Sequence, residues 1–358
     1  MNKPKKGTGK IKIYTLISIL LSLIVIILIL YFTFNAQTLY YLSHTRIRYE
    51  YFLIAVLLNI SSWFLWGFRL KVMSNALDPE LHIGLLESTK IVIANLFLAC
   101  ITPALIGGEP LRIYLLKKDG MKLGCATAAI LGERLIDAIL VLIAVPFAFF
   151  IFKDRLGNST LTLALTIGII FFIGFLLVFL YALKNPDKIK SFLIFINNKI
   201  NRLFRRKEDP ESSKFVNFVE REVDYFHTSM TFFAGEGKKT FLFVSLLTLA
   251  YWAVCFMIAS MLLLGLGLPP FFLESYAAQM LLLVIVAIPT TPGSSGVAEL
   301  SMGGFYGVLI GTSYGYLLGV FVFLFRFITY HMNLMAGAIF QYRIFKSLTS
   351  FSFDIFKK

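Results

Sequence analysis

Long apolar runs alternate with short polar segments along almost the whole chain. A helix needs about 20 consecutive apolar residues to cross the hydrocarbon core of a bilayer, and six of the runs reach or exceed that length. The runs that we interpret as full spans are residues 13–34, 51–72, 123–152, 159–183, 240–264 and 314–340. The pattern therefore predicts an all-α polytopic membrane protein with about six full spans.

Two further apolar runs, residues 85–118 and 272–311, are interrupted near their middle. Proline removes a backbone donor and glycine weakens a helix, so we expect a non-helical break in each run. Hydrocarbon cannot satisfy the freed backbone groups, and such a break persists only inside protein or against a water-filled cavity. We predict two re-entrant hairpins, whose breaks contain Pro103, Gly107, Gly108, Pro110, Pro289, Pro292, Gly293 and Gly296.

Basic residues at the ends of the spans predict their orientation, because cytoplasmic loops are enriched in Lys and Arg. Lysines precede the first span, Arg69 and Lys71 end the second, and Lys117 and Lys118 follow the first hairpin. We therefore expect both termini to be cytoplasmic in a multi-pass protein of the cell membrane. The first hairpin then enters from the cytoplasm and the second from outside.

The two halves of the chain share a series of residues at a near-constant offset of 187–192 positions. The pairs are Trp63 and Trp252, Pro79 and Pro269, Glu87 and Glu274, Pro103 and Pro292, Glu109 and Glu299, and Arg134 and Arg326. With the orientation above, this series predicts an inverted repeat, the architecture of secondary transporters. We divide the chain into a basic flank, first span and outer loop (1–50), a first repeat with a return span (51–183), a linker (184–239), a second repeat (240–342) and a cytoplasmic tail (343–358).

The linker is the most polar part of the chain, and its first half is strongly basic. Apolar residues recur within it at spacings of three and four, which is typical of amphipathic helices. We interpret two such helices as lying on the inner leaflet, in contact with anionic lipid. A solvated connector with incidental apolar faces is the alternative.

Composition excludes a soluble domain. Of the 358 residues 58% are hydrophobic and 15% are charged, with a mean hydropathy of +0.79, whereas soluble proteins carry about 25% charged residues. The net charge of +14 resides largely at the ends of apolar segments, so we expect contact with lipid and no nucleic-acid partner. The three cysteines and four histidines show no ligand spacing, and we expect no metal and no cofactor.

Charged residues also occur deep inside two predicted spans. Glu133, Arg134 and Asp137 follow Leu123 by ten to fourteen residues, which is roughly 15–20 Å at 1.5 Å per residue. Arg326 lies at a similar depth in the last span. A charge at that depth costs about 2.5–3.5 kcal/mol, so it needs a polar interior and a partner.

These charges have two interpretations. In the first, they neutralise one another and hold helices together. In the second, they line a polar cavity in which the arginines bind anionic groups, because a guanidinium donates two parallel hydrogen bonds to phosphate. The carboxylates then bind a cationic head group or take up protons. We interpret Trp63 and Trp66 as anchors at the membrane interface.

The motifs GGEPLR (107–112), GERLID (132–137) and TPGSSGVAE (291–299) resemble a flippase-like integral membrane family. It is named after the transmembrane region of lysylphosphatidylglycerol synthase, and the resemblance extends over residues 51–342. In its best-understood members, the multiple peptide resistance factors, the membrane half moves aminoacylated phosphatidylglycerol to the outer leaflet. The candidate head-group or coupling residues that the resemblance implies are Glu109, Arg112, Glu133, Arg134, Asp137, Glu299 and Arg326.

This chain ends at Lys358 without the soluble aminoacyl-transferase domain of those relatives, and we expect it not to be an enzyme. The leading hypothesis is a flippase that moves a polar-headed lipid, such as an aminoacylated or anionic phospholipid or a polyprenyl-linked sugar. Alternatives are a secondary transporter of a small solute, an intramembrane lipid-modifying enzyme, and a non-catalytic scaffold for a synthase or glycosyltransferase partner. No nucleophile supports the enzyme.

Overall fold

A computed structural model describes residues 35–44, 47–102, 107–152, 159–203, 211–288 and 291–347, with a few positions between 20 and 31. The regular elements in these ranges are all helices. Most of the predicted first span, together with Pro103, Pro289 and residues 348–358, lies outside the described residues. The structure agrees with the prediction of an all-helical protein.

The elements of the first half and the linker follow the predicted order. They are α2 (Ala36–His44), α3 (Tyr49–Leu77), α4 (Leu85–Ile101), α5 (Gly108–Lys118), α6 (Leu123–Phe152), α7 (Ser159–Lys184), α8 (Pro186–Leu203) and α9 (Glu211–Ala234). The interruption between α4 and α5 falls at the predicted first break.

The second half begins with the long helix α10 (Lys238–Gly265). The elements that follow are α11 (Phe272–Val286), α12 (Val297–Ile310), the 3₁₀ turn η1 (Thr312–Leu317), α13 (Leu318–Arg326), the π-helical segment η2 (Phe327–His331) and α14 (Met332–Ser347). The interruption between α11 and α12 falls at the second predicted break.

Four segments in the described part of the chain are long and apolar enough to cross a membrane: Tyr49–Leu77, Leu123–Phe152, Lys238–Gly265 and Thr312–Phe340. Only 22–50% of the residues in their most apolar windows are buried inside the protein. The remaining apolar side chains face outward, which is stable in hydrocarbon and unfavourable in water. The chain is a polytopic membrane protein.

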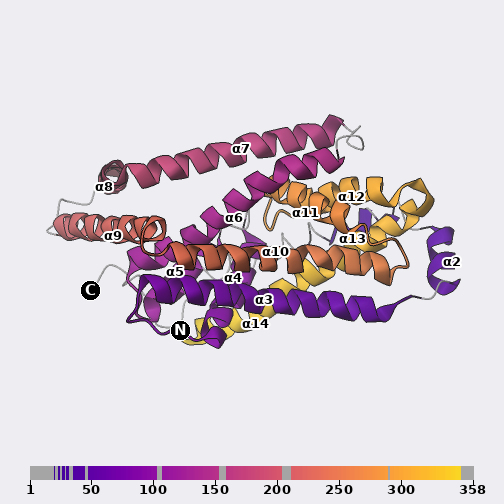
Figure 1. Cartoon of the computed structure of the whole chain (residues 1–358), viewed down its shortest axis with the longest axis horizontal. Coiled ribbons are helices and arrows are strands. Elements are labelled where there is room, and N and C mark those ends of the chain that lie inside the picture. Colours follow the sequence, from indigo (N-terminus) through magenta and orange to yellow (C-terminus); the bar gives the residue numbers. More distant parts are fainter. Residues whose placement is uncertain are drawn as a thin grey trace, which may run out of the picture.

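The two broken helix pairs lie toward opposite ends of the molecule (Figure 1). Helices α4 and α5 lie toward the end that carries α8 and α9, whereas α11 and α12 lie toward the end that carries α2 (Figure 1). Helices α3 and α10 pack side by side and run in opposite directions along the long axis. They connect the two ends of the molecule.

Each broken pair packs in its own apolar core. One core surrounds α4 and α5 with residues of α3 and the first part of α6, such as Met73 and Ile130. The other surrounds α11 and α12 with residues of α10, α13 and the second part of α6, such as Leu262 and Phe321. Helix α6 contributes to both cores, and each hairpin packs within one of them.

The linker forms the two predicted helices, but α9 does not lie free on a membrane surface. Val219, Val223, Met230 and Phe233 on its apolar face are buried, and the helix packs along α6. The predicted amphipathic helix therefore has α6 against its apolar face, and contact of the linker with lipid stays a prediction. On α8, by contrast, Phe192 and Phe195 are exposed.

Candidate functional site

The two broken hairpins touch each other at their breaks. The backbone N–H of Gly293 donates a 2.9 Å hydrogen bond to the carbonyl oxygen of Thr102, the residue that ends α4. The hydroxyl oxygen of Thr102 accepts a 2.9 Å hydrogen bond from the N–H of Gly107, at the start of α5. In two separate hairpins these backbone groups would have no partner. They form hydrogen bonds where the hairpins meet, and a buried backbone group needs such a bond.

The second break is shaped by residues with left-handed backbone. Gly293 and Gly296 have φ angles of +62° and +89°, and Ser294 between them has +50°. Glycine adopts this region at no steric cost, which is why the PGSSG sequence turns here and does not continue the helix. The Gly296 N–H donates a 2.6 Å hydrogen bond to the Glu299 carboxylate, so Glu299 caps the helix that it begins.

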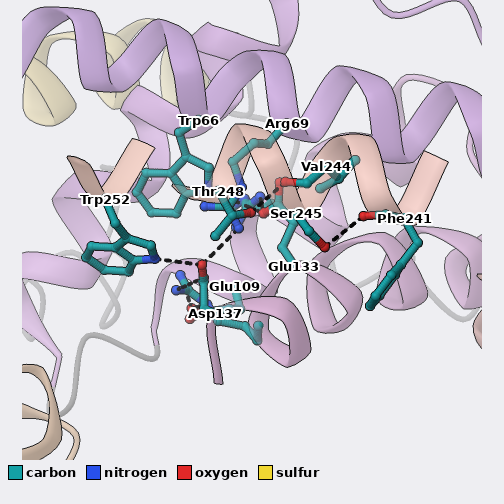
Figure 2. A network of polar contacts seen from close by, with 12 residues as sticks. Trp66, Arg69, Glu109, Glu133, Asp137, Phe241, Val244, Ser245, Thr248 and Trp252 are labelled. Carbon is teal, nitrogen blue, oxygen red and sulfur yellow. Dashed lines mark hydrogen bonds and ion pairs between the residues drawn. The ribbon is translucent and has the colours of Figure 1, made fainter. Parts of the chain in front are cut away.

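In the first half, the predicted residues meet in one network, in which Arg112 and Glu133 are buried and Arg134 and Glu109 are partly exposed. Arg112 of α5 is ion-paired with Glu133 of α6, and the Trp66 indole N–H donates to the same Glu133 oxygen at 3.3 Å. Arg134 pairs with Glu109 at 2.8 Å and with Asp137 at 3.4 Å. Figure 2 shows this cluster of residues between α3, α6 and α10.

Arg69 also belongs to this network, although sequence reasoning assigned it to a cytoplasmic flank. Its guanidinium lies 3.0 Å from an Asp137 oxygen, and its side chain is only 1% exposed. Helix α3 continues to Leu77, well past the apolar run, and Arg69 lies inside the protein. Its use as a signal for a cytoplasmic flank stays a prediction. The spacing was a usable signal, since Trp66 and Arg69 are three residues apart and share a helix face.

Two tryptophans at equivalent positions of the two halves each form a hydrogen bond with a residue of the other half. Trp252 of α10 donates to Asp137 of α6 at 3.0 Å, as Figure 2 shows. Trp63 of α3 donates to the side-chain oxygen of Asn333 in α14 at 2.9 Å. Each indole therefore reaches from its own half into the other. The interpretation of Trp63 as an interface anchor does not hold, because its polar atom is bonded within the protein.

Trp66 contacts two guanidinium groups. The Arg112 and Arg134 guanidinium carbons are 5.1 Å and 5.5 Å from its ring centre. Such cation–π contacts contribute about 2 kcal/mol when they are desolvated. Trp66 is thus a structural partner of the charged network and not an anchor in the lipid interface.

The second half holds a separate ion pair. Arg326 donates to Glu299 at 2.8 Å and lies over the ring of Tyr330, 4.2 Å from its centre. Both charged groups are buried. The pair repeats the 2.8 Å contact between Arg134 and Glu109 of the first half, so each half joins the first turn of its second hairpin helix to the following span.

A π-helical segment begins immediately after Arg326. Asn59 of α3 donates from its side-chain amide to the carbonyl of Ile328 in this segment at 3.1 Å, and to Asn333 at 3.0 Å. π-Helical turns inside longer helices occur frequently at functional sites. Here the turn exposes a carbonyl to a partner from the other half.

The charges of the first network balance, since three arginines face three carboxylates. Several of its buried polar atoms nevertheless have no hydrogen-bond partner: Arg69 Nε, Arg112 Nε and Nη1, Glu109 Oε2 and Glu133 Oε1. Each such atom costs about 1–3 kcal/mol. The arrangement can exchange partners or admit a polar ligand. Within the described ranges, no group of three or more metal-ligating side chains is placed to hold a metal ion.

These features define a class: polytopic membrane proteins in which two broken helical hairpins meet inside the protein beside buried charges. The chain belongs to the family described as the lysylphosphatidylglycerol synthase TM region, whose model matches residues 16–337. The resemblance drawn from the three motifs is confirmed.

Relatives with the name UPF0104 membrane protein occur in three archaea. This chain is 35% identical to that of Archaeoglobus fulgidus over 337 residues, which is 93% of this chain and 98% of the relative. The identity is 24% over 259 residues for Methanothermobacter thermautotrophicus (70% and 72% of the two chains) and 22% over 285 residues for Pyrococcus horikoshii (78% and 83%). No solved structure matches the chain.

Proposed function

We propose that this protein is a lipid translocase, which moves a polar-headed lipid between leaflets while the lipid chains stay in the bilayer. The observation that carries the proposal is the contact of the two breaks through Gly293 and Thr102. An ion pair follows each break: Glu109–Arg134, which is partly exposed, and Glu299–Arg326, which is buried. Polar groups at this depth support the proposal, because a head group that binds to them does not have to meet hydrocarbon.

The proposal includes an inverted repeat of two units, each a span, a re-entrant hairpin and a span. Support comes from the opposite placement of the two hairpins (Figure 1) and from the matched ion pairs Glu109–Arg134 and Glu299–Arg326. Six full spans, cytoplasmic termini, and contact of α8 with anionic inner-leaflet lipid through its exposed Phe192 and Phe195 complete the topology.

Transport then requires two states that open to opposite leaflets. The bonds from Trp63 to Asn333 and from Trp252 to Asp137 cross between the halves and hold the present state. Only a substrate or proton that binds the two states with different affinity shifts their equilibrium. The carboxylates of the network are the groups that we assign to this coupling.

The substrate class is a lipid whose head group carries an anion or several hydroxyl groups, such as an anionic or aminoacylated phospholipid or a polyprenyl-linked sugar. Buried arginines match the anionic part. The chain acts by binding and movement in this proposal, without a catalytic role, and a synthase or glycosyltransferase partner supplies the lipid.

Leaflet exchange in vesicles tests the proposal. The purified protein is reconstituted with trace fluorescent phosphatidylglycerol, phosphatidylcholine or lysyl-phosphatidylglycerol, and a membrane-impermeant quencher reports the lipid that reaches the outer leaflet. We expect quenching of at least one lipid to proceed beyond the half that protein-free vesicles show. The double variant Glu109→Gln/Arg134→Gln removes one ion pair without stranding a charge, and we expect it to abolish exchange.

The matched control removes an ion pair outside the network. Lys190 and Asp224 pair at 2.7 Å between α8 and α9, and the variant Lys190→Ala/Asp224→Ala should exchange lipid as the wild type does. Equal exchange by the network variant would refute the site. No exchange of any lipid by the wild type would refute the translocase, and vesicle uptake of a soluble solute would then identify a solute transporter.

A further inference from the structure

Asn95, in the middle of α4, is a buried amide with no hydrogen-bond partner. Its side chain is only 1% exposed, and neither Oδ1 nor Nδ2 is bonded. An amide can make four hydrogen bonds, so a buried amide that makes none has a cost of about 1–3 kcal/mol for each lost group. The unpaired amide lowers the stability of this state, so we infer that Asn95 has another role.

The amide lies at the beginning of α5. A methyl group placed on Gly108 would come within 1.7 Å of Asn95 Oδ1, so the two helices approach here only because Gly108 has no side chain. The first turn of a helix carries free N–H groups and a partial positive charge. Asn95 therefore stands against the anion-binding end of an eleven-residue helix.

Arg112 lies one turn further along α5, four residues from Gly108, and so on the same face. Long helical side chains point toward the helix N-terminus, which brings the guanidinium toward Gly108. Its side chain is 0% exposed, and one nitrogen pairs with Glu133, whereas Nε and Nη1 have no partner. Two unused donors thus remain on a buried cation.

The second half lacks this arrangement. At the offset of 189–192 residues that relates the halves, Asn95, Arg112 and Glu133 correspond to Val284, Met302 and Phe325, all of which are buried apolar residues. The Glu109–Arg134 pair, by contrast, corresponds to Glu299–Arg326. The unpaired amide and the arginine with unused donors therefore occur in the first half alone, among the residues that this offset relates.

We propose that Asn95, the N-terminus of α5 at Gly108, and Arg112 form a binding site for the phosphate group of the substrate. The proposal deepens the proposed function and rests on it for the lipid character of the substrate. Arg112 Nη1 donates to one oxygen of the phosphate in a charge-assisted hydrogen bond. Asn95 Nδ2 donates to a second oxygen, and the helix N-terminus favours the negative charge.

The bond between Arg112 and Glu133 persists in this arrangement, because it uses the third guanidinium nitrogen, Nη2. Glu133 then fixes the guanidinium plane while Nη1 binds the ligand. Asn95 Oδ1 remains free to accept a hydrogen bond from a hydroxyl group of the head group. The site thus selects a phosphate diester that carries a polyol over a neutral lipid.

The test is binding of short-chain probes to the full chain purified in detergent. The probes are dihexanoyl-phosphatidylglycerol, glycerol phosphate and uncharged dihexanoylglycerol, measured by calorimetry. The substitution Asn95→Leu keeps the number and branching of the side-chain heavy atoms and removes the amide. We expect it to weaken binding of the phospholipid about tenfold or more, as the loss of one hydrogen bond to a charged group predicts.

Ser260 provides the matched control, since its hydroxyl in α10 is also buried and without a partner. Ser260→Ala should bind the phospholipid as the wild type does. If Asn95→Leu does not fold, the near-isosteric Asn95→Asp replaces it, and its negative charge should reduce phospholipid binding by at least the same factor.

Unchanged phospholipid binding by a folded Asn95 variant would overturn the site and leave the translocase standing if the same variant still exchanges lipid. Equal binding of dihexanoylglycerol by the wild type would also overturn it. Glycerol phosphate binding as tightly as the phospholipid, with the same loss in the Asn95 variant, would support the phosphate site and refute a lipid substrate.

Discussion

Arg69 and Asp137 show how single residues set the character of this protein. Arg69 is buried in a segment that crosses the membrane, and it is bonded to a carboxylate that also accepts from Trp252 and Arg134. Desolvation of two charges opposes their attraction, so a buried pair adds little net stability, whereas removal of one partner is expensive. We therefore infer that the network serves function more than stability. A substitution of one charged residue alone should destabilise the fold.

We predict that Arg69→Met lowers the free energy of unfolding by about 3–5 kcal/mol, because Asp137 loses its most buried cation and the network keeps three carboxylates with two arginines. The double variant Arg69→Met/Asp137→Leu should recover most of that loss, since no charge is then stranded. Thermal unfolding in detergent, with each single variant measured beside the double, gives the coupling energy. A double variant no more stable than Arg69→Met would contradict the account of a self-neutralising network.

At this scale the sequence predicts contacts within one helix better than contacts between helices. Arg134 and Asp137 are three residues apart, and the structure joins them. The partner of Asp137 on α3 was missed, because an arginine at the end of an apolar run is usually a cytoplasmic flank. Asn95 gave no signal either, since what singles it out is the absence of a partner in the folded chain.

At the scale of elements, α9 packs closely against the beginning of α6 and holds it in place. The Glu222 carboxylate accepts a 2.8 Å hydrogen bond from the N–H of Gly124, and the Gly124 position leaves no room for a side chain, with the Glu222 carbonyl oxygen 2.4 Å from an added Cβ. Helix α6 carries Glu133, Arg134 and Asp137. The linker thereby fixes the position of the helix on which the charged network depends.

We predict that Gly124→Val separates α9 from α6, because the valine would overlap the α9 backbone. Hydrogen exchange of α9 should increase at least tenfold, since its apolar face loses its cover. Gly174→Val in α7 is the matched control, as nothing lies within 4 Å of an added Cβ there, and it should leave α9 protected. Unchanged hydrogen exchange of α9 in the Gly124 variant would show that α9 does not depend on this contact with α6.

The linker also shows that an apolar pattern predicts a helix more readily than it predicts what the helix packs against. Spacings of three and four apolar residues predicted both helices. A periodic apolar face packs equally well against a membrane or against another helix, and only the fold shows that α6 covers α9. Phe192 and Phe195 of α8 remain exposed, so the structure leaves apolar side chains for the predicted lipid contact on α8.

At the scale of the whole molecule, two hairpins held in separate cores meet through their backbones at Gly293 and Thr102. The position of the hairpins follows from the sequence, because proline and glycine interrupt apolar runs at both places. Their contact does not, since it depends on how α3 and α10 bring the two ends together. The candidate residues also divide into two groups, with Glu299 and Arg326 paired apart from the first network.

The claim on which the account depends is that the halves face opposite sides of the membrane, and its most direct test is accessibility labelling. Single cysteines replace Lys118, after the first hairpin, and Phe272, at the start of the second, both of which are exposed. The wild type, whose cysteines lie in apolar helices, provides the background. A membrane-impermeant thiol reagent should label the Phe272→Cys variant in intact cells and Lys118→Cys only after permeabilisation. Labelling of both variants from the same side would contradict the inverted architecture and the translocase built on it.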